Sequence, residues 1–138
     1  MVLWAHNGHV NRVAGTMGGH LGAHYGDAMR VIGFGLGDGD YTAIGPRGLA
    51  SYPAATPQSG SIEEAFRATG LPRFALDLRG VAGRPDAAWL ATPHDFRSIG
   101  SLAMDGGFFP VSLASAFDAV IYFDHTKPTA AFGSRAKP

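Results

Sequence analysis

Short apolar runs separated by glycine-rich and polar segments make up most of this chain. Three of these runs predict strands, at residues 30–36, 73–78 and 117–123, and a shorter strand is predicted at 96–100. The run 117–123 is almost continuously apolar, which is typical of a parallel strand covered on both faces.

Helical spacing lies between these runs. Apolar residues recur every three or four positions and predict a helix at 17–25. Ser61 and Glu64 have the spacing of a capping box, in which each side chain accepts a hydrogen bond from the other residue's free backbone amide. They predict a helix that begins at Ile62, and Pro85 is well placed to begin a further short helix.

The order of these elements predicts the fold class. Alternating strands and helices favour an α/β fold, a mostly parallel sheet with helices on both faces, as a single domain over residues 1–138. Residues 37–60 are rich in Gly, Pro, Ser and Thr. We predict them to be a long irregular segment, with a short strand at 41–44, of the kind that forms lids or binding loops. The polar residues after Asp124 are expected to fray.

Composition excludes several classes of protein. Eleven basic residues balance eleven acidic ones, and there is no cysteine. Without a basic cluster or an apolar run of about 20 residues, neither nucleic acid nor a membrane is expected as a partner. Without cysteine there is neither a disulfide framework nor a thiolate. The first residues do not resemble a signal peptide, so we expect a cytoplasmic protein.

The first dozen residues carry the strongest candidate chemistry. Residues 2–5 are predicted as a short strand that runs into an Asn7-Gly8 turn flanked by His6 and His9. In open α/β sheets, ligand sites lie where strands end. Histidine transfers protons near neutral pH, so we predict His6 and His9 as catalytic residues that face one cleft. The alternative is a pair of turn histidines satisfied by backbone or water.

Other candidate sites are weaker. His6, His9, His20 and His24 could be metal ligands, but the 20–24 helix lacks the glutamate of a zinc-protease helix, so no metal is predicted. The glycines of 33–39 do not have dinucleotide-binding spacing, and no cofactor is predicted. No serine lies in a nucleophile elbow. The only glutamates, Glu63 and Glu64, are both assigned a structural role in the capping box. Asp77, Asp118 and Asp124 lie at strand ends, as anchors or as partners that orient a histidine.

Taken in order, several segments resemble the erythromycin esterase family. The most specific is the H-N-x-H stretch within W-A-H-N-G-H-V at residues 4–10. The others are residues 17–21, 25–27, 31–34, 60–65, 74–79, 97–100 and 117–124. The resemblance covers essentially the whole chain.

This resemblance implies an α/β hydrolase with a deep cleft. Members of the family hydrolyse the lactone ester of macrolide antibiotics, or have unassigned hydrolytic roles, with histidine-activated water. By resemblance, His6 and His9 bind or polarise the ester carbonyl and assist proton transfer. The family's proposed general base and its glutamate lie upstream of H-N-x-H, where this chain begins. We therefore expect the C-terminal portion of an esterase, acting on a small-molecule ester. The alternative is an inactive or ligand-binding fragment that needs its missing N-terminal half. The isolated chain is expected to self-associate.

Overall fold

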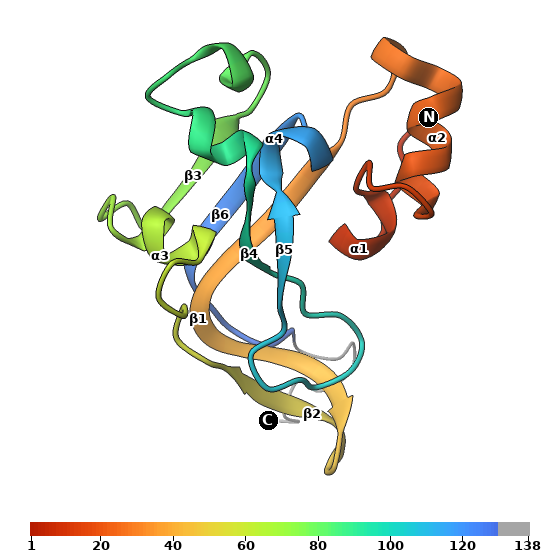
Figure 1. Cartoon of the computed structure of the whole chain (residues 1–138). Helices are drawn as coiled ribbons and strands as arrows, with labels where there is room; N and C mark the ends of the chain where they lie inside the picture. Colours follow the sequence, from red (N-terminus) through yellow and green to blue (C-terminus); the bar gives the residue numbers. More distant parts are fainter. Residues whose placement is uncertain (130–138) are drawn as a thin grey trace.

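The computed structural model describes residues 1–129, and its centre is a four-stranded sheet (Figure 1). The strand order is β2-β1-β6-β3, and a separate two-stranded sheet pairs β4 with β5. The strands are β1 (Ile32–Gly45), β2 (Gly48–Ala54), β3 (Arg73–Asp77), β4 (Pro93–Arg97), β5 (Phe108–Ser112) and β6 (Ala119–Thr126). The helices are α1 (Asn7–Val10), α2 (Met17–Tyr25), α3 (Ile62–Arg67) and α4 (Leu113–Ala116), with 3₁₀ turns at Gly26–Ala28, Val81–Gly83 and Ala88–Ala91.

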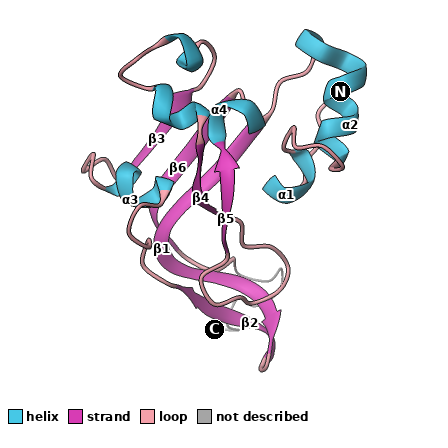
Figure 2. Ribbon diagram, viewed as in Figure 1, coloured by secondary structure: helices cyan, strands magenta, loops and turns pink. Residues whose placement is uncertain are grey.

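The predicted fold class is wrong in two respects. Only β1 and β6 are parallel, whereas β2 pairs with β1 and β3 pairs with β6 in antiparallel register. Helices do not cover both faces: α3, α4 and the β4–β5 sheet lie over one face, and α1 and α2 lie beside the end of β1 (Figure 2). The chain is therefore a small α/β domain with a mixed sheet, because a tight hairpin replaces the expected helical crossover after β1.

The segment predicted as a long irregular loop forms that hairpin. Strand β1 continues without interruption to Gly45, and β2 returns beside it through a turn in which Gly48 has a φ of 72°. Gly33 and Gly35 of β1 are two residues apart, so they face the same side of the sheet. A Cβ on Gly33 would lie 2.9–3.1 Å from the Phe117 ring, and one on Gly35 would lie 3.3 Å from Phe96. These glycines allow aromatic rings to pack directly on the strand.

The hydrophobic core lies between this covered face and the layer above it. Phe66 of α3, Phe74 of β3 and Tyr122 of β6 stack with ring centroids 5.2–5.3 Å apart. Phe96 and Phe117 form a second pair at 6.2 Å. All of these rings except Phe74 are almost fully buried. Burial of this aromatic surface is the main stabilising contribution to the fold.

The helix positions were predicted more accurately than the sheet topology. Helix α2 has the predicted bounds, and α3 begins after Ser61, whose Oγ accepts a hydrogen bond from the Glu64 amide at 3.2 Å. The Glu64 carboxylate accepts from the Gly60 amide at 2.7 Å, not from the Ser61 amide, so the capping box is only half formed. The helix expected after Pro85 is a 3₁₀ turn at Ala88–Ala91.

Strand positions are shifted by a few residues. Strand β4 covers Pro93–Arg97, whereas the corresponding strand was predicted at 96–100. Strand β6 extends beyond Asp124 to Thr126. The predicted fraying therefore begins too early; residues 130–138 lie outside the described part of the chain. The predicted strand at 2–5 is absent: these residues are exposed and no described strand pairs with them. No helix within residues 1–129 is long and apolar enough to cross a bilayer.

Candidate functional site

The histidine motif opens a one-turn helix instead of the predicted turn at the end of a strand. His6 is the N-cap of α1: its Nδ1 accepts a hydrogen bond from the Gly8 amide at 3.1 Å. Its backbone carbonyl accepts from the His9 and Val10 amides, at 2.8 and 3.1 Å. The asparagine and glycine that favour a turn are also compatible with the first turn of a capped helix.

Both ring nitrogens of His6 are engaged. Besides the bond to Nδ1, Nε2 lies 2.5 Å from the carbonyl oxygen of Ile99, 93 residues further along the chain. A carbonyl only accepts and an amide only donates, so this geometry corresponds to the neutral tautomer with its proton on Nε2. In this arrangement the His6 ring joins α1 to the segment that follows β4.

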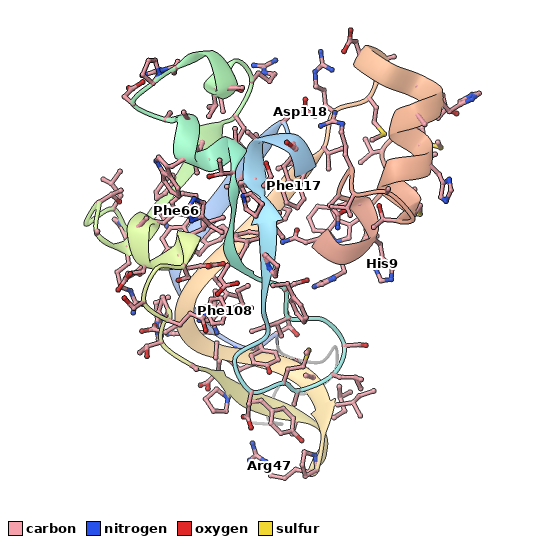
Figure 3. The ribbon with its side chains drawn as sticks, viewed as in Figure 1. His9, Arg47, Phe66, Phe108, Phe117 and Asp118 are labelled. Atoms are coloured by element: carbon pink, nitrogen blue, oxygen red, sulfur yellow. The ribbon has the colours of Figure 1, made fainter. Side chains whose placement is uncertain are left out.

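His9 differs from His6 in its freedom. Its ring is exposed, and neither nitrogen has a hydrogen-bond partner within the described residues. The two ring centroids are 6.1 Å apart with an interplanar angle of 77°. Figure 3 shows His9 projecting outward from α1. Of the two predicted histidines, His9 therefore has nitrogens that are free to exchange protons with a ligand or water.

Asn7 fastens the motif to the sheet. Its Nδ2 donates to the Phe34 carbonyl at 2.6 Å, and its Oδ1 accepts from the Phe34 amide at 3.0 Å. The side-chain amide thus pairs with Phe34 as a neighbouring strand would. It occupies part of the edge of β1 over residues 32–36, which has no partner strand among the described residues.

Two further contacts attach the motif segment to α2 and to the sheet. Gly18 of α2 packs so closely on α1 that a Cβ there would lie 1.9 Å from the Val10 carbonyl oxygen. Arg12 donates to Asp118 Oδ2 at 2.6 Å, and the same oxygen accepts from the Val31 amide at 2.6 Å. Asp118 is therefore an anchor that ties the motif segment to β1 and β6, and not a partner of His6 or His9.

The other two strand-end aspartates also have roles away from the motif. Asp77 pairs with the exposed Arg79. Asp124 accepts from Arg67 of α3 at 2.8 Å and from the Tyr122 hydroxyl at 2.9 Å. Neither orients a motif histidine.

The four histidines considered as metal ligands do not form one cluster in the structure. His20 and His24 are exposed on α2, where His24 packs edge-on against Tyr25. Among residues 1–129, no group of three or more His, Asp or Glu side chains is arranged to hold a metal ion.

A cavity of about 860 Å³ adjoins the motif. Its walls are mostly apolar and come from residues 1–5, α2 and the face of β1 and β6 that helices leave uncovered. Trp4 lies over Phe34 there, with ring centroids 5.8 Å apart. His6 and Asn7 line it, whereas His9 lies outside it. The geometry is that of a mostly apolar binding cleft whose lining also includes a few polar groups, with His6 and Asn7 where it meets the motif.

Glu63 is a buried carboxyl group that the sequence interpretation assigned to the helix cap. Its side chain is fully buried, and Oε1 accepts from the Arg97 amide at 2.8 Å. Burial raises the pKa of this carboxyl to about 7, despite the opposing effect of Arg97. The available signal was positional: a capping box uses only the third helical residue, Glu64, and leaves Glu63 without a role at the cap.

Comparison with known proteins shows the family of this chain. The erythromycin esterase family model matches residues 1–126, and the chain belongs to that family.

Two crystal structures have a similar fold. A Bacillus cereus protein is 25% identical, with a TM-score of 0.77 over 91% of this chain and 33% of its own. A protein described as a succinoglycan biosynthesis protein is 21% identical, with a TM-score of 0.79 over 90% of this chain and 32% of its own. This chain thus spans about a third of the length of either structure.

Proposed function

We propose that this chain contributes the H-N-x-H wall of a cleft in which carboxylic esters are hydrolysed by histidine-activated water. The observation that carries the proposal is the contrast between the two histidines beside an apolar cavity. His6 is fixed through both nitrogens, and His9 is free. The apolar walls suit the hydrophobic body of an ester, and the polar groups of His6 and Asn7 suit its carbonyl group.

Within this proposal the histidines have different tasks. His9 exchanges the proton with water or the leaving alcohol, since its nitrogens have no described partner. His6 sets the position of the motif and orients it toward the ester. Macrolide lactones are one substrate case, in which the chain would serve a response to antibiotics in the cytoplasm; other small esters are the second.

The test is hydrolysis of a p-nitrophenyl ester and of a macrolide lactone by the chain, with His9→Ala and His6→Ala variants. Loss of a positioned general acid–base group lowers the rate by about 10²–10⁴-fold. His24→Ala is the matched control, because His24 is an exposed histidine on α2 outside the motif. Hydrolysis that survives His9→Ala, or that falls equally with His24→Ala, would contradict the proposal.

A second candidate function is that of a domain that must bind further polypeptide before it can act. Ile32, Phe34 and Phe123 are exposed on one face of the sheet, and this fold occupies only a third of the two similar structures. Exposed apolar faces of this kind are interaction surfaces. Under this proposal the chain alone binds ligand or self-associates, and hydrolysis requires polypeptide packed on that face.

Light scattering over a range of concentrations distinguishes the two candidates. Self-association that Phe34→Asp abolishes supports the second. Leu49→Asp is the control, because Leu49 is exposed in the β1–β2 hairpin, away from the motif. A concentration-independent monomer that turns over an ester would contradict the second candidate.

A further inference from the structure

A buried polar pair lies behind the histidine motif on the covered side of the sheet. Glu63 of α3 is fully buried, and Arg97 at the end of β4 is 3% exposed. We infer that Glu63 is a positioning residue for the motif: it holds the end of β4, from which Ile99 holds the His6 ring. The inference rests on the proposed function only in treating His6 as part of the site.

The connection is a short series of hydrogen bonds along three consecutive residues. Glu63 Oε1 accepts from the Arg97 amide at 2.8 Å. The Ser98 amide donates to the Gly107 carbonyl at 2.8 Å, and the Ile99 carbonyl then accepts from His6 Nε2 at 2.5 Å. The carboxyl group and the imidazole are therefore joined through the main chain of three consecutive residues, each of which makes a hydrogen bond.

The pair acts through this main chain because its own charged atoms are closed to a ligand. Within residues 1–129, Glu63 Oε2 and Arg97 Nε and Nη1 have no hydrogen-bond partner, and they are shut off from solvent. Arg97 Nη2 donates to the Gly37 and Ala55 carbonyls, and its guanidinium lies 4.5 Å from the centre of the Phe108 ring. A buried carboxyl and guanidinium with three unpaired atoms destabilise a fold. If Glu63 and Arg97 served only to fill the core, an apolar pair at these two positions would give a more stable fold.

The surroundings of Glu63 make its charge responsive to pH. Within the elements that α3 contacts, the charged or titratable groups near Glu63 and Arg97 are Asp95 and Arg97 of β4, Asp38 and Tyr41 of β1, and Tyr122 and Asp124 of β6. Asp38 and Asp124 are each paired with Arg67 at 2.8 Å, which leaves Arg97 as the counter-charge of Glu63. Burial raises the pKa of Glu63 to about 7. A carboxylate accepts a stronger hydrogen bond than a neutral carboxyl group, so the hold on the Arg97 amide tightens as pH rises through 7.

NMR of the full chain tests this without any measurement of turnover. The Glu63 side-chain carbon reports its ionisation, the Arg97 amide proton reports the hydrogen bond, and the ring nitrogens of His6 report tautomer and environment. We expect the NMR signals of the Arg97 amide and the His6 ring to shift with the same midpoint as Glu63. Glu63→Gln removes that shared transition, and Glu64→Gln, at the helix cap, keeps it.

Two results would overturn the inference. In the wild-type chain, Glu63 could titrate while the Arg97 amide and the His6 ring do not follow it; this reading needs no variant to fold. In the Glu63→Gln variant, the NMR signals of the His6 ring could depend on pH in the same way as in the wild-type chain. Since neither readout depends on ester hydrolysis, failure of the proposed function and failure of this inference are distinguishable.

Discussion

The two faces of β1 are opposites in composition and in cover. On one face, glycines at 33 and 35 lie beneath Phe117 and Phe96, and Phe117 is 2% exposed. On the other face Ile32 and Phe34 project from the same strand, and Phe34 is 42% exposed. Small residues thus lie where the cover is dense, and large apolar residues lie where no described element covers them.

This difference shows where the histidine motif is supported. The covered face carries a closed core of aromatic and aliphatic side chains, most of which come from residues that follow β1 in the chain. The motif lies at the boundary with the open face, and Asn7, His6 and Gly18 attach it through individual contacts. The contacts that attach the motif therefore differ from those that form the core, although Glu63 links the two regions, and variants can test them separately.

The largest expected effect comes from the same truncation on each face. Phe117→Ala removes a buried ring and should lower the free energy of unfolding by about 3–5 kcal/mol. Phe34→Ala removes a ring that is already partly in water and should lower it by about 1 kcal/mol or less. Urea denaturation of both variants measures the difference. Equal losses would mean that the open face is covered in solution, and the Phe34→Ala loss would then depend on protein concentration.

A buried carboxyl on the covered side should give stability an unusual dependence on pH. The pKa of Glu63 rises from an ordinary value of 4.5 to about 7 on folding, so the folded state binds the proton more tightly. Stability should fall as pH rises from about 4.5 to 7 and then stay level, by up to about 3 kcal/mol from this group. The carboxylates with lowered pKa values, such as Asp38, act in the opposite direction but at lower pH.

Thermal unfolding of Glu63→Gln between pH 5 and 8 checks this slope. The variant cannot ionise, so its stability should be flatter across the window than that of the wild-type chain. Glu64→Gln should keep the wild-type slope, because Glu64 lies at the exposed cap of α3. An unchanged slope in Glu63→Gln would show that another group titrates in this range.

Local signals in the sequence located the helices, but not the sheet topology. Helix α2 and the start of α3 follow from apolar spacing and a cap, which depend only on neighbouring residues. The glycines after residue 36 looked like loop residues, because nothing local shows that Gly37 and Gly39 would lie against the backbone of β6. The direction of β3 and the β1–β2 hairpin likewise depend on pairing between residues far apart.

The sequence analysis named candidate residues for the site but did not predict how they are arranged. The motif spacing drew attention to His6 and His9, and their proposed catalytic roles remain predictions. No local pattern could show that Ile99 fixes His6, because the two are 93 residues apart. Glu63 was overlooked because it stands beside a residue with an obvious capping role.

Two glycines on α2 provide a sharper test of how the motif is held. Gly18→Ala places a methyl group on the Val10 carbonyl and should lower the free energy of unfolding by about 1–3 kcal/mol as α1 is pushed away. Gly22→Ala meets only side chains at 3.6 Å or more and should stabilise the helix by up to about 1 kcal/mol. Chemical denaturation and the His6 NMR signals follow both. A neutral Gly18→Ala would mean that α1 is not packed on α2 in solution.

The smallest expected effect concerns the edge of β1. Asn7→Ala removes the two hydrogen bonds with Phe34 but leaves that backbone open to water, so the free energy of unfolding should fall by only about 1 kcal/mol. Hydrogen exchange is the more sensitive measurement, because adjacent residues of a strand direct their amides to opposite sides. The Phe34 amide should exchange faster in the variant, whereas the Gly35 amide, which faces β6, should not change. If both amides accelerate together, Asn7 supports the β1–β6 pairing as a whole; if neither does, its side chain does not protect the edge.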